Sequence, residues 1–128
     1  MKKLYSFLFV FFLLISCATH TKSLNGTWRQ QILGFEGEKS GYGIVNDSTI
    51  ITLDLTKNQV IRFSYNDGYE DDIADSIHYH PPQLNFRKQN YNKSYNRYSL
   101  QYDLGCDCFT GHFKSYTGNT IKVKWLRN

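Results

Sequence analysis

The chain has 128 residues, which suits a single domain of ordinary size, and 41% of these residues are hydrophobic. Fifteen lysine and arginine residues face eleven aspartate and glutamate residues, so the net charge at pH 7 is only +4. The sequence shows no clear run of basic residues that would follow a phosphate backbone. We therefore expect no nucleic acid partner.

The first 17 residues form a targeting segment. Lys2 and Lys3 precede about a dozen apolar residues, a length typical of a signal peptide and short of the roughly 20 that a spanning helix needs. The segment ends in Leu14-Ile15-Ser16-Cys17, which closely resembles the lipobox of bacterial lipoproteins. That resemblance implies cleavage before Cys17, lipidation of this cysteine with palmitate-type chains, and attachment to a membrane of the cell envelope. A buried helix or an uncleaved anchor is the alternative, and the polar residues 19–23 disfavour it.

Residues 18–24 then form a short polar tether, which reaches roughly 25 Å at about 3.3 Å per residue. By analogy with enteric lipoproteins, Ala18 favours transfer to the outer membrane. Without the signal, 13 lysine and arginine residues face 11 acidic residues, which lowers the net charge to +2. Residues 25–128 are expected to form the folded domain.

In this domain, apolar and polar residues alternate, which is the pattern of half-buried β-strands. Ile51, Leu53 and Leu55, for example, alternate with Thr52 and Asp54. No segment shows a sustained helical stripe. We expect an all-β fold, a small antiparallel up-and-down barrel of about eight strands, with a sandwich as the alternative. The predicted strands cover residues 26–33, 39–46, 49–55, 59–65, 83–89, 94–103, 107–116 and 120–127, with a turn at Asn46-Asp47-Ser48.

Gly26-Thr27-Trp28, at the start of the first predicted strand, resembles the Gly-x-Trp signature of lipocalins and lipocalin-like bacterial lipoproteins. The resemblance implies that Trp28 closes one end of the barrel and that an arginine of the last strand packs across it. Arg127 is the arginine in that position. A guanidinium on an indole contributes about 1 kcal/mol.

Cys106-Asp107-Cys108 is the most unusual local feature after the lipobox. An oxidising compartment favours a disulfide between Cys106 and Cys108, if Gly105 supplies a bend. Free thiols are the second interpretation. A metal site, formed by the two thiols with His78 and His80, is a distant third because the spacing matches no usual zinc motif.

The sequence gives little support for catalysis. It lacks a nucleophile elbow and a phosphate-binding loop. A pair of Cys108 and His112 would be separated by about 13 Å on an extended strand, out of hydrogen-bond reach. We therefore expect no enzyme, no catalytic residue and no cofactor.

Two functions remain from different classes. The first is binding of a small apolar or amphipathic ligand inside a lipocalin-like barrel anchored to the outer membrane. The second is a protein–protein module, such as an inhibitor of lysozyme or protease or a toxin immunity protein, that uses loops 66–82 and 90–93. Loop 66–82 is long and acidic at first, so it is either a solvated loop or a binding lid, and it suits a basic partner. The candidate ligand-binding residues of the interior are Trp28, Phe63, Tyr65, Tyr98, Phe113 and Trp125.

Overall fold

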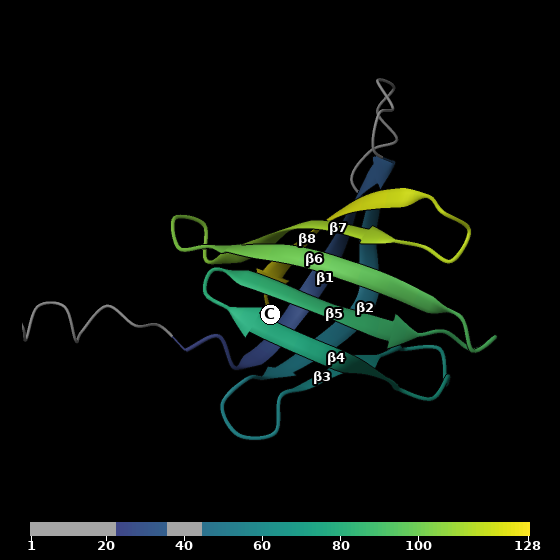
Figure 1. Ribbon diagram of the computed structural model, residues 1–128, viewed down its shortest axis with the longest axis horizontal. Helices are drawn as coiled ribbons and strands as arrows, with labels where there is room; N and C mark the ends of the chain where they lie inside the picture. The colour runs from purple at the N-terminus through teal and green to yellow at the C-terminus, as the bar shows by residue number, and fades with distance from the viewer. Residues whose placement is uncertain (1–22, 36–44) are drawn as a thin grey trace, which may run out of the picture.

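The computed structural model describes residues 23–35 and 45–128. They form a closed barrel in which every strand is antiparallel to its neighbours in the chain, and the last strand pairs with the first (Figure 1). This confirms the predicted all-β, antiparallel up-and-down barrel. The described residues include no helix long and apolar enough to cross a membrane. The strands are β1 (Gly26–Phe35), β2 (Val45–Asp54), β3 (Val60–Ser64), β4 (Asp72–His80), β5 (Gln83–Gln89), β6 (Tyr95–Asp103), β7 (Cys108–Lys114) and β8 (Thr120–Arg127).

The signal segment 1–17, with Cys17, and most of the tether lie outside the described residues. The same holds for most of the predicted strand 39–46. Its last residues belong to β2, which runs without a break through the predicted turn at 46–48. The turn prediction was therefore wrong.

A bulge explains why turn residues occur inside β2. Gln31 pairs with Asn46 and Arg29 pairs with Ile50, so three residues of β2 lie opposite Gln30 alone. Asp47 stabilises the bulge, because its carboxylate accepts hydrogen bonds from the backbone nitrogen and the hydroxyl of Thr49, at 3.2 and 2.7 Å. Short polar residues bond to the nearby backbone in bulges as they do in turns.

The sequence also placed a single loop over residues 66–82, and this prediction was wrong for most of the segment. β4 occupies Asp72–His80, and only residues 65–71 connect it to β3. A bulge between Asp75 and His78 breaks the alternation, with Ser76 at a φ of 51°. The two-residue period is therefore interrupted in the middle of the strand.

Aromatic side chains fill the barrel. Trp125 is fully buried, and the rings of Phe63, Phe86 and Phe109 lie 5.8–6.0 Å from its own. Its indole nitrogen donates to the side-chain oxygen of buried Gln30 at 3.0 Å, which satisfies the one polar atom that the ring carries into the core. Every residue expected to point inward is buried except Tyr65, which is half-buried.

The direction of the strands gives the barrel two distinct ends. The closed end carries Ser23–Asn25, where the described chain enters β1, together with the 104–107 turn and Arg127. The mouth, at the opposite end, carries residues 65–71, 90–94 and 115–119. In Figure 1 the closed end lies to the left and the mouth to the right.

Candidate functional site

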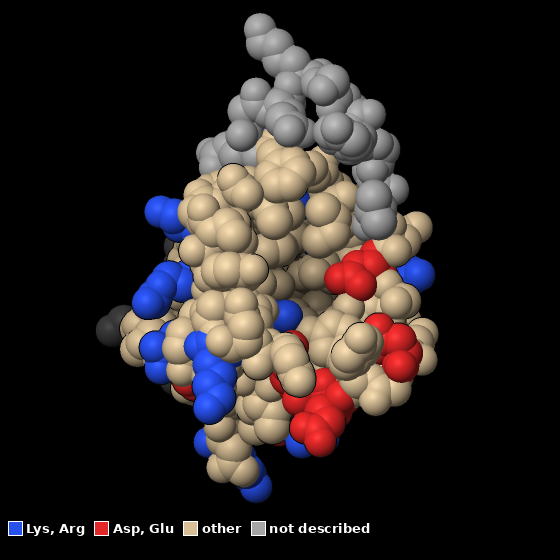
Figure 2. Space-filling view, turned by 90° about the vertical axis from the view of Figure 1, so that its right-hand side faces the viewer, with Lys and Arg blue, Asp and Glu red and all other residues tan. Residues whose placement is uncertain are grey.

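A hollow of about 580 Å³ opens at the mouth, between the β3–β4 loop and the β5–β6 turn. Figure 2 looks onto this end and shows carboxylates beside and below the depression. The two segments that line it are well separated in sequence, and barrel closure brings them together. The lining residues are Tyr65, Asp67, Gly68, Tyr69, Glu70, Asp71, Asp72 and Tyr91.

Two of the lining residues, Tyr65 and Asp72, form a hydrogen-bonded triad with Lys88. The hydroxyl of Tyr65 donates to Asp72 at 2.6 Å and accepts a hydrogen bond from the Lys88 ammonium at 2.9 Å. Lys88 also contacts the Asp72 carboxylate at 3.3 Å, and its nitrogen lies 5.2 Å from the ring centre of Phe63. Partial burial, and then the bond to Asp72, raise the pKa of Tyr65 well above its usual range. The phenol therefore stays protonated and keeps Asp72 in place.

The rim of the hollow is both acidic and aromatic. Tyr69 is 70% exposed and Tyr91 is 100% exposed. Asp71 lies 3.9 Å from Arg62, whereas Asp67 and Glu70 pair with no cation among residues 23–35 and 45–128. Exposed aromatic faces beside unpaired carboxylates are the groups that recognise a guanidinium or ammonium ion.

The turn that presents Tyr91 is well ordered by its own hydrogen bonds. The backbone nitrogen of Asn90 donates to the carbonyl oxygen of Ser94 at 2.7 Å. The side-chain amide nitrogen of Asn90 donates to the side-chain oxygen of Asn96 at 3.0 Å. Lys93 takes the left-handed conformation that the tight turn requires, with a φ of 65°. These contacts hold the turn while its tyrosine ring remains in solvent.

The interior residues proposed for ligand binding pack against one another. Trp28, Phe63 and Trp125 are exposed by 1% or less. Tyr98 stacks on one side against Phe86, at 4.6 Å between ring centres, and on the other against Phe113 at 4.9 Å. A ligand among them would have to displace these rings. Of the six candidates, Tyr65 alone lines the hollow at the mouth, and ligand binding inside the barrel stays a prediction.

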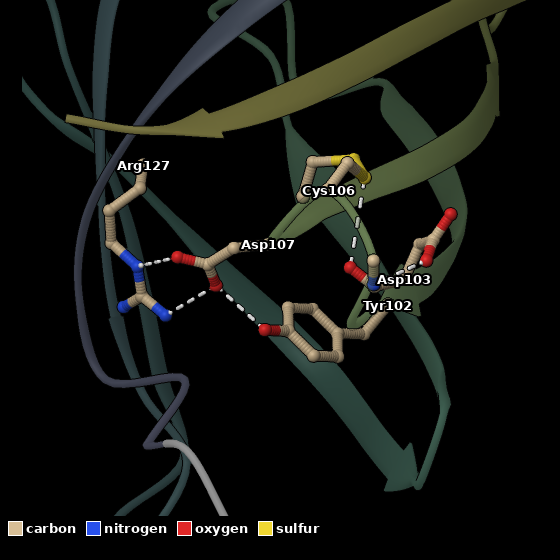
Figure 3. The surroundings of a disulfide bond; sticks show 7 residues. Tyr102, Asp103, Cys106, Asp107 and Arg127 are labelled. Atoms are coloured by element: carbon tan, nitrogen blue, oxygen red, sulfur yellow. Dashed lines mark hydrogen bonds and ion pairs between the residues drawn. A yellow bond between two sulfur atoms is a disulfide. The ribbon is translucent and has the colours of Figure 1, made fainter.

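At the closed end the structure places Arg127 across Trp28. The guanidinium carbon lies 4.2 Å from the ring centre. Arg127 also donates to Asp107 through two nitrogens, at 3.0 and 3.2 Å, and the hydroxyl of Tyr102 donates to the same carboxylate at 2.6 Å (Figure 3). Sequence reasoning missed Tyr102 and Asp107 in this network, and their only signal is that Tyr102 lies shortly before one short turn and Asp107 ends that turn.

Cys106 and Cys108 form a disulfide, with their α-carbons 5.2 Å apart. The intervening Asp107 has a φ of 47°, and its side chain points from this turn toward Arg127 (Figure 3). Because the two sulfurs are bonded to each other, they are not free to bind a metal. The described part of the chain contains no group of three His, Cys, Asp or Glu residues arranged to hold an ion, and His78 and His80 lie on β4.

Comparison with protein-family models, curated proteins and solved structures finds no match to this chain. The geometry of the two ends is therefore what bears on function. Of the two loops that the sequence proposed for partner binding, the structure brings residues 67–72 and Tyr91 to one hollow. Residues 73–82 belong to β4 and to the turn that follows it.

Proposed function

We propose that the protein is a lipoprotein, anchored to the outer membrane through Cys17, whose barrel is a non-catalytic module that binds a basic segment of a partner protein at its mouth. The observation that carries this proposal is the hollow in which three tyrosines and four carboxylates meet. An inhibitor of a basic enzyme, such as a lysozyme, or an immunity protein against a basic toxin fits this chemistry.

Electrostatics supports a basic partner. Four carboxylates line the hollow, and the two cations in contact with them, Lys88 and Arg62, neutralise only part of the charge. An acidic site of this kind accelerates association with a basic protein, and the rate falls as salt screens the attraction.

The tyrosines supply the contact area that carboxylates lack. Tyrosine buries a large apolar ring and still presents a hydroxyl, so it is enriched at the energetic centres of protein interfaces. Tyr91 is fully exposed and Tyr69 largely so, which means that both rings have most of their surface left to bury. The hollow between them is open enough to admit a protruding side chain of a partner.

The place where the chain enters the barrel also favours this role. Ser23–Asn25 lies at the closed end, and Cys17 precedes Ser23 by only six residues, or roughly 20 Å of extended chain. An anchor at Cys17 therefore holds the protein by the end opposite the mouth. The mouth remains accessible to a partner in the surrounding compartment.

A short arginine-rich peptide is a direct probe of the mouth, with a glutamate-rich peptide as its control. Residues 18–128 contain the eight strands and the buried core residues that the structure describes, and NMR would report which tyrosines shift on titration. We expect the arginine peptide to shift Tyr65, Tyr69 and Tyr91, and Tyr91→Ser to weaken binding. Tyr116→Ser is the matched control, because Tyr116 is an exposed tyrosine at the same end that does not line the hollow. Equal effects of the two variants would contradict the proposal.

The inhibitor function has its own assay. A c-type lysozyme is mixed with residues 18–128, and its rate of cell-wall hydrolysis is measured with the parent and with Asp67→Asn/Glu70→Gln. Inhibition that the double variant abolishes would support this partner class. Undiminished hydrolysis would remove lysozyme from the proposal and leave the peptide result to decide the site.

A small amphipathic ligand remains the second candidate, because half-buried Tyr65 lies between the packed interior and the hollow. Native mass spectrometry of gently purified protein tests it. Extra mass from a lipid-sized molecule would favour the ligand function, and a bare protein would favour the partner function. Lipidation is tested separately, because Cys17→Ala should abolish the acyl mass and the partitioning into detergent.

A further inference from the structure

The outer face of β5 to β8 carries a band of basic residues that is not evident in the sequence. Arg87, Arg97 and Lys114 lie directly opposite one another on β5, β6 and β7, and His112 lies opposite Lys122. Each strand contributes only every second residue to this band, because the residues between them point into the barrel. The basic residues therefore form no continuous run in the sequence. We call this surface the basic wall; it consists of Arg87, Arg97, His112, Lys114, Lys122 and Lys124.

Within the part of the chain that the structure describes, almost no acidic residue balances this wall. β5, β7 and β8 contain no aspartate or glutamate, and the one carboxylate of β6 is Asp103 at its closed-end terminus. Asp75, on the neighbouring β4, forms an ion pair with Arg87. Arg97, Lys114 and Lys122 take part in no ion pair within the described residues. Figure 2 shows this separation of charge, with lysine and arginine gathered on the left flank and most carboxylates to the right and below.

Like charges directly opposite each other on adjacent strands destabilise a sheet. Arg97 is such a case, since it faces Arg87 on one side and Lys114 on the other. The described structure offers Arg97 and Lys114 no internal counter-charge. An external surface of negative charge would relieve this repulsion.

A recess at the edge of the wall adds a specific feature. The bulge of β4 opens a groove of about 320 Å³ in the side of the barrel, between Ser76 and His78 on one strand and Arg87 and Arg97 on the next two. Phe86 and Tyr98, which are both buried, also line this groove. Its walls supply guanidinium, imidazole and hydroxyl groups, which are donors that suit phosphate oxygens.

We propose that the basic wall lies against the anionic phospholipid headgroups of a membrane surface. Each lysine or arginine near such a surface contributes about 1 kcal/mol, and the attraction acts within roughly 8–10 Å at physiological salt. An extended tether of about 20 Å between Cys17 and Ser23 is long enough for the barrel to lie on its side. The acidic mouth then opens along the membrane, while the wall faces the lipid.

Vesicle binding tests the wall without the lipid anchor and without the mouth. Residues 18–128 are sedimented with vesicles of phosphatidylcholine containing phosphatidylglycerol, and with vesicles of phosphatidylcholine alone. We expect binding to the anionic vesicles only, and a decrease in binding as salt is added. Absence of this difference would overturn the proposal and would leave the proposed function at the mouth untouched.

Two variants with the same change in net charge assign the effect to the wall. Arg97→Gln/Lys114→Gln should weaken binding about 25-fold, at roughly fivefold per cation. Lys57→Glu lowers the net charge by the same two units at the exposed β2–β3 turn, which belongs neither to the wall nor to the mouth, and it should leave binding close to that of the parent. An equal loss in both variants would show a net-charge effect and would overturn the proposal.

Two further measurements complete the test. Relief of the Arg97–Lys114 repulsion should leave the melting temperature of the wall variant equal to or above that of the parent; if this variant unfolds, Lys122→Gln/Lys124→Gln replaces it. Binding to heparin as a soluble polyanion is measured in parallel. Tight binding to heparin with none to vesicles would assign the wall to a polymer and overturn the membrane proposal.

Discussion

Arg127 and Trp28 lie opposite each other in the β1–β8 pairing, and the guanidinium of Arg127 covers the indole ring at 4.2 Å. The same guanidinium donates to the backbone carbonyls of Ser23 and Asn25, at 3.0 and 3.2 Å. The indole nitrogen of Trp28 donates to the carbonyl of Leu24 at 3.1 Å. One pair of side chains thus joins the first strand, the last strand and the segment that leads into the barrel.

Replacing Arg127 should therefore destabilise the fold. Arg127→Met loses the contact with Trp28, the ion pair with Asp107 and two bonds to carbonyl oxygens, and we expect a loss of about 2–3 kcal/mol. Urea denaturation measures it. Arg97→Met is the control, because Arg97 lies on the basic wall and forms no ion pair in the described structure. This variant should change stability by no more than about 0.5 kcal/mol. Similar effects of the two variants would show that the network at the closed end contributes little.

Stability should fall at alkaline pH because of buried phenols. Burial raises the pKa of Tyr65 and of Tyr98 in the folded protein above the ordinary value of 10.0. A group with a raised folded pKa contributes stability that is complete below the unfolded pKa and is lost as pH rises above it. The free energy of unfolding should thus decrease as pH rises above about 10.

Tyr65→Phe isolates one of these phenols. It should cost about 1 kcal/mol at pH 7, through the lost hydrogen bonds to Asp72 and Lys88. It should also show a shallower loss of stability at alkaline pH than the parent, because a phenylalanine ring has no hydroxyl to ionise. Urea titrations at neutral pH and at about pH 11 measure both effects, and parallel pH profiles for the two proteins would contradict the prediction.

Reduction of the Cys106–Cys108 disulfide should destabilise the protein by about 1–2 kcal/mol, because it closes only a very short loop. Part of this effect should act through Asp107, which the loop directs at Arg127. The loss on reduction should therefore be smaller in the Arg127→Met background. Additive losses, measured by urea denaturation with and without reductant, would show that the disulfide and the arginine act independently.

Gly111 should tolerate no side chain. A β-carbon at this position would lie 2.1 Å from the carbonyl oxygen of Ser99 on the neighbouring strand, which is backbone and cannot move freely. Gly111→Ala should cost about 2–3 kcal/mol through overpacking. Thr110→Ala, one residue away on the exposed face, is the control and should have little effect. A melting temperature for Gly111→Ala equal to that of the control would mean that the strands can separate locally.

The barrel could be predicted from the sequence because long stretches of its strands alternate between buried and exposed positions. Ile51 and Leu53, for example, are buried, while Thr52 and Asp54 are exposed. The two errors have one physical cause, since β2 and β4 each contain a bulge that interrupts the two-residue period. Asp47 and Ser76 occupy these bulges, and residues of this kind are also typical of turns.

The candidate sites were predictable only in part. The acidic loop and Tyr91 were visible separately, but their meeting at one hollow depends on barrel closure. The basic wall depends on strand register, because Arg97 and Lys114 become neighbours only when β6 pairs with β7. The charge and hydrophobicity of individual residues do not indicate which strands pair or in which register.

The bonds from Arg127 to Ser23 and Asn25 also determine how the protein would respond to mechanical force. A pull on the chain before Ser23 reaches these two carbonyls, and with them the guanidinium, before it reaches the hydrogen bonds of β1. The load therefore passes to the start of the first strand and the end of the last strand together. A tension that would detach a single strand from an open sheet must here first break the contact between Arg127 and the segment that leads into β1.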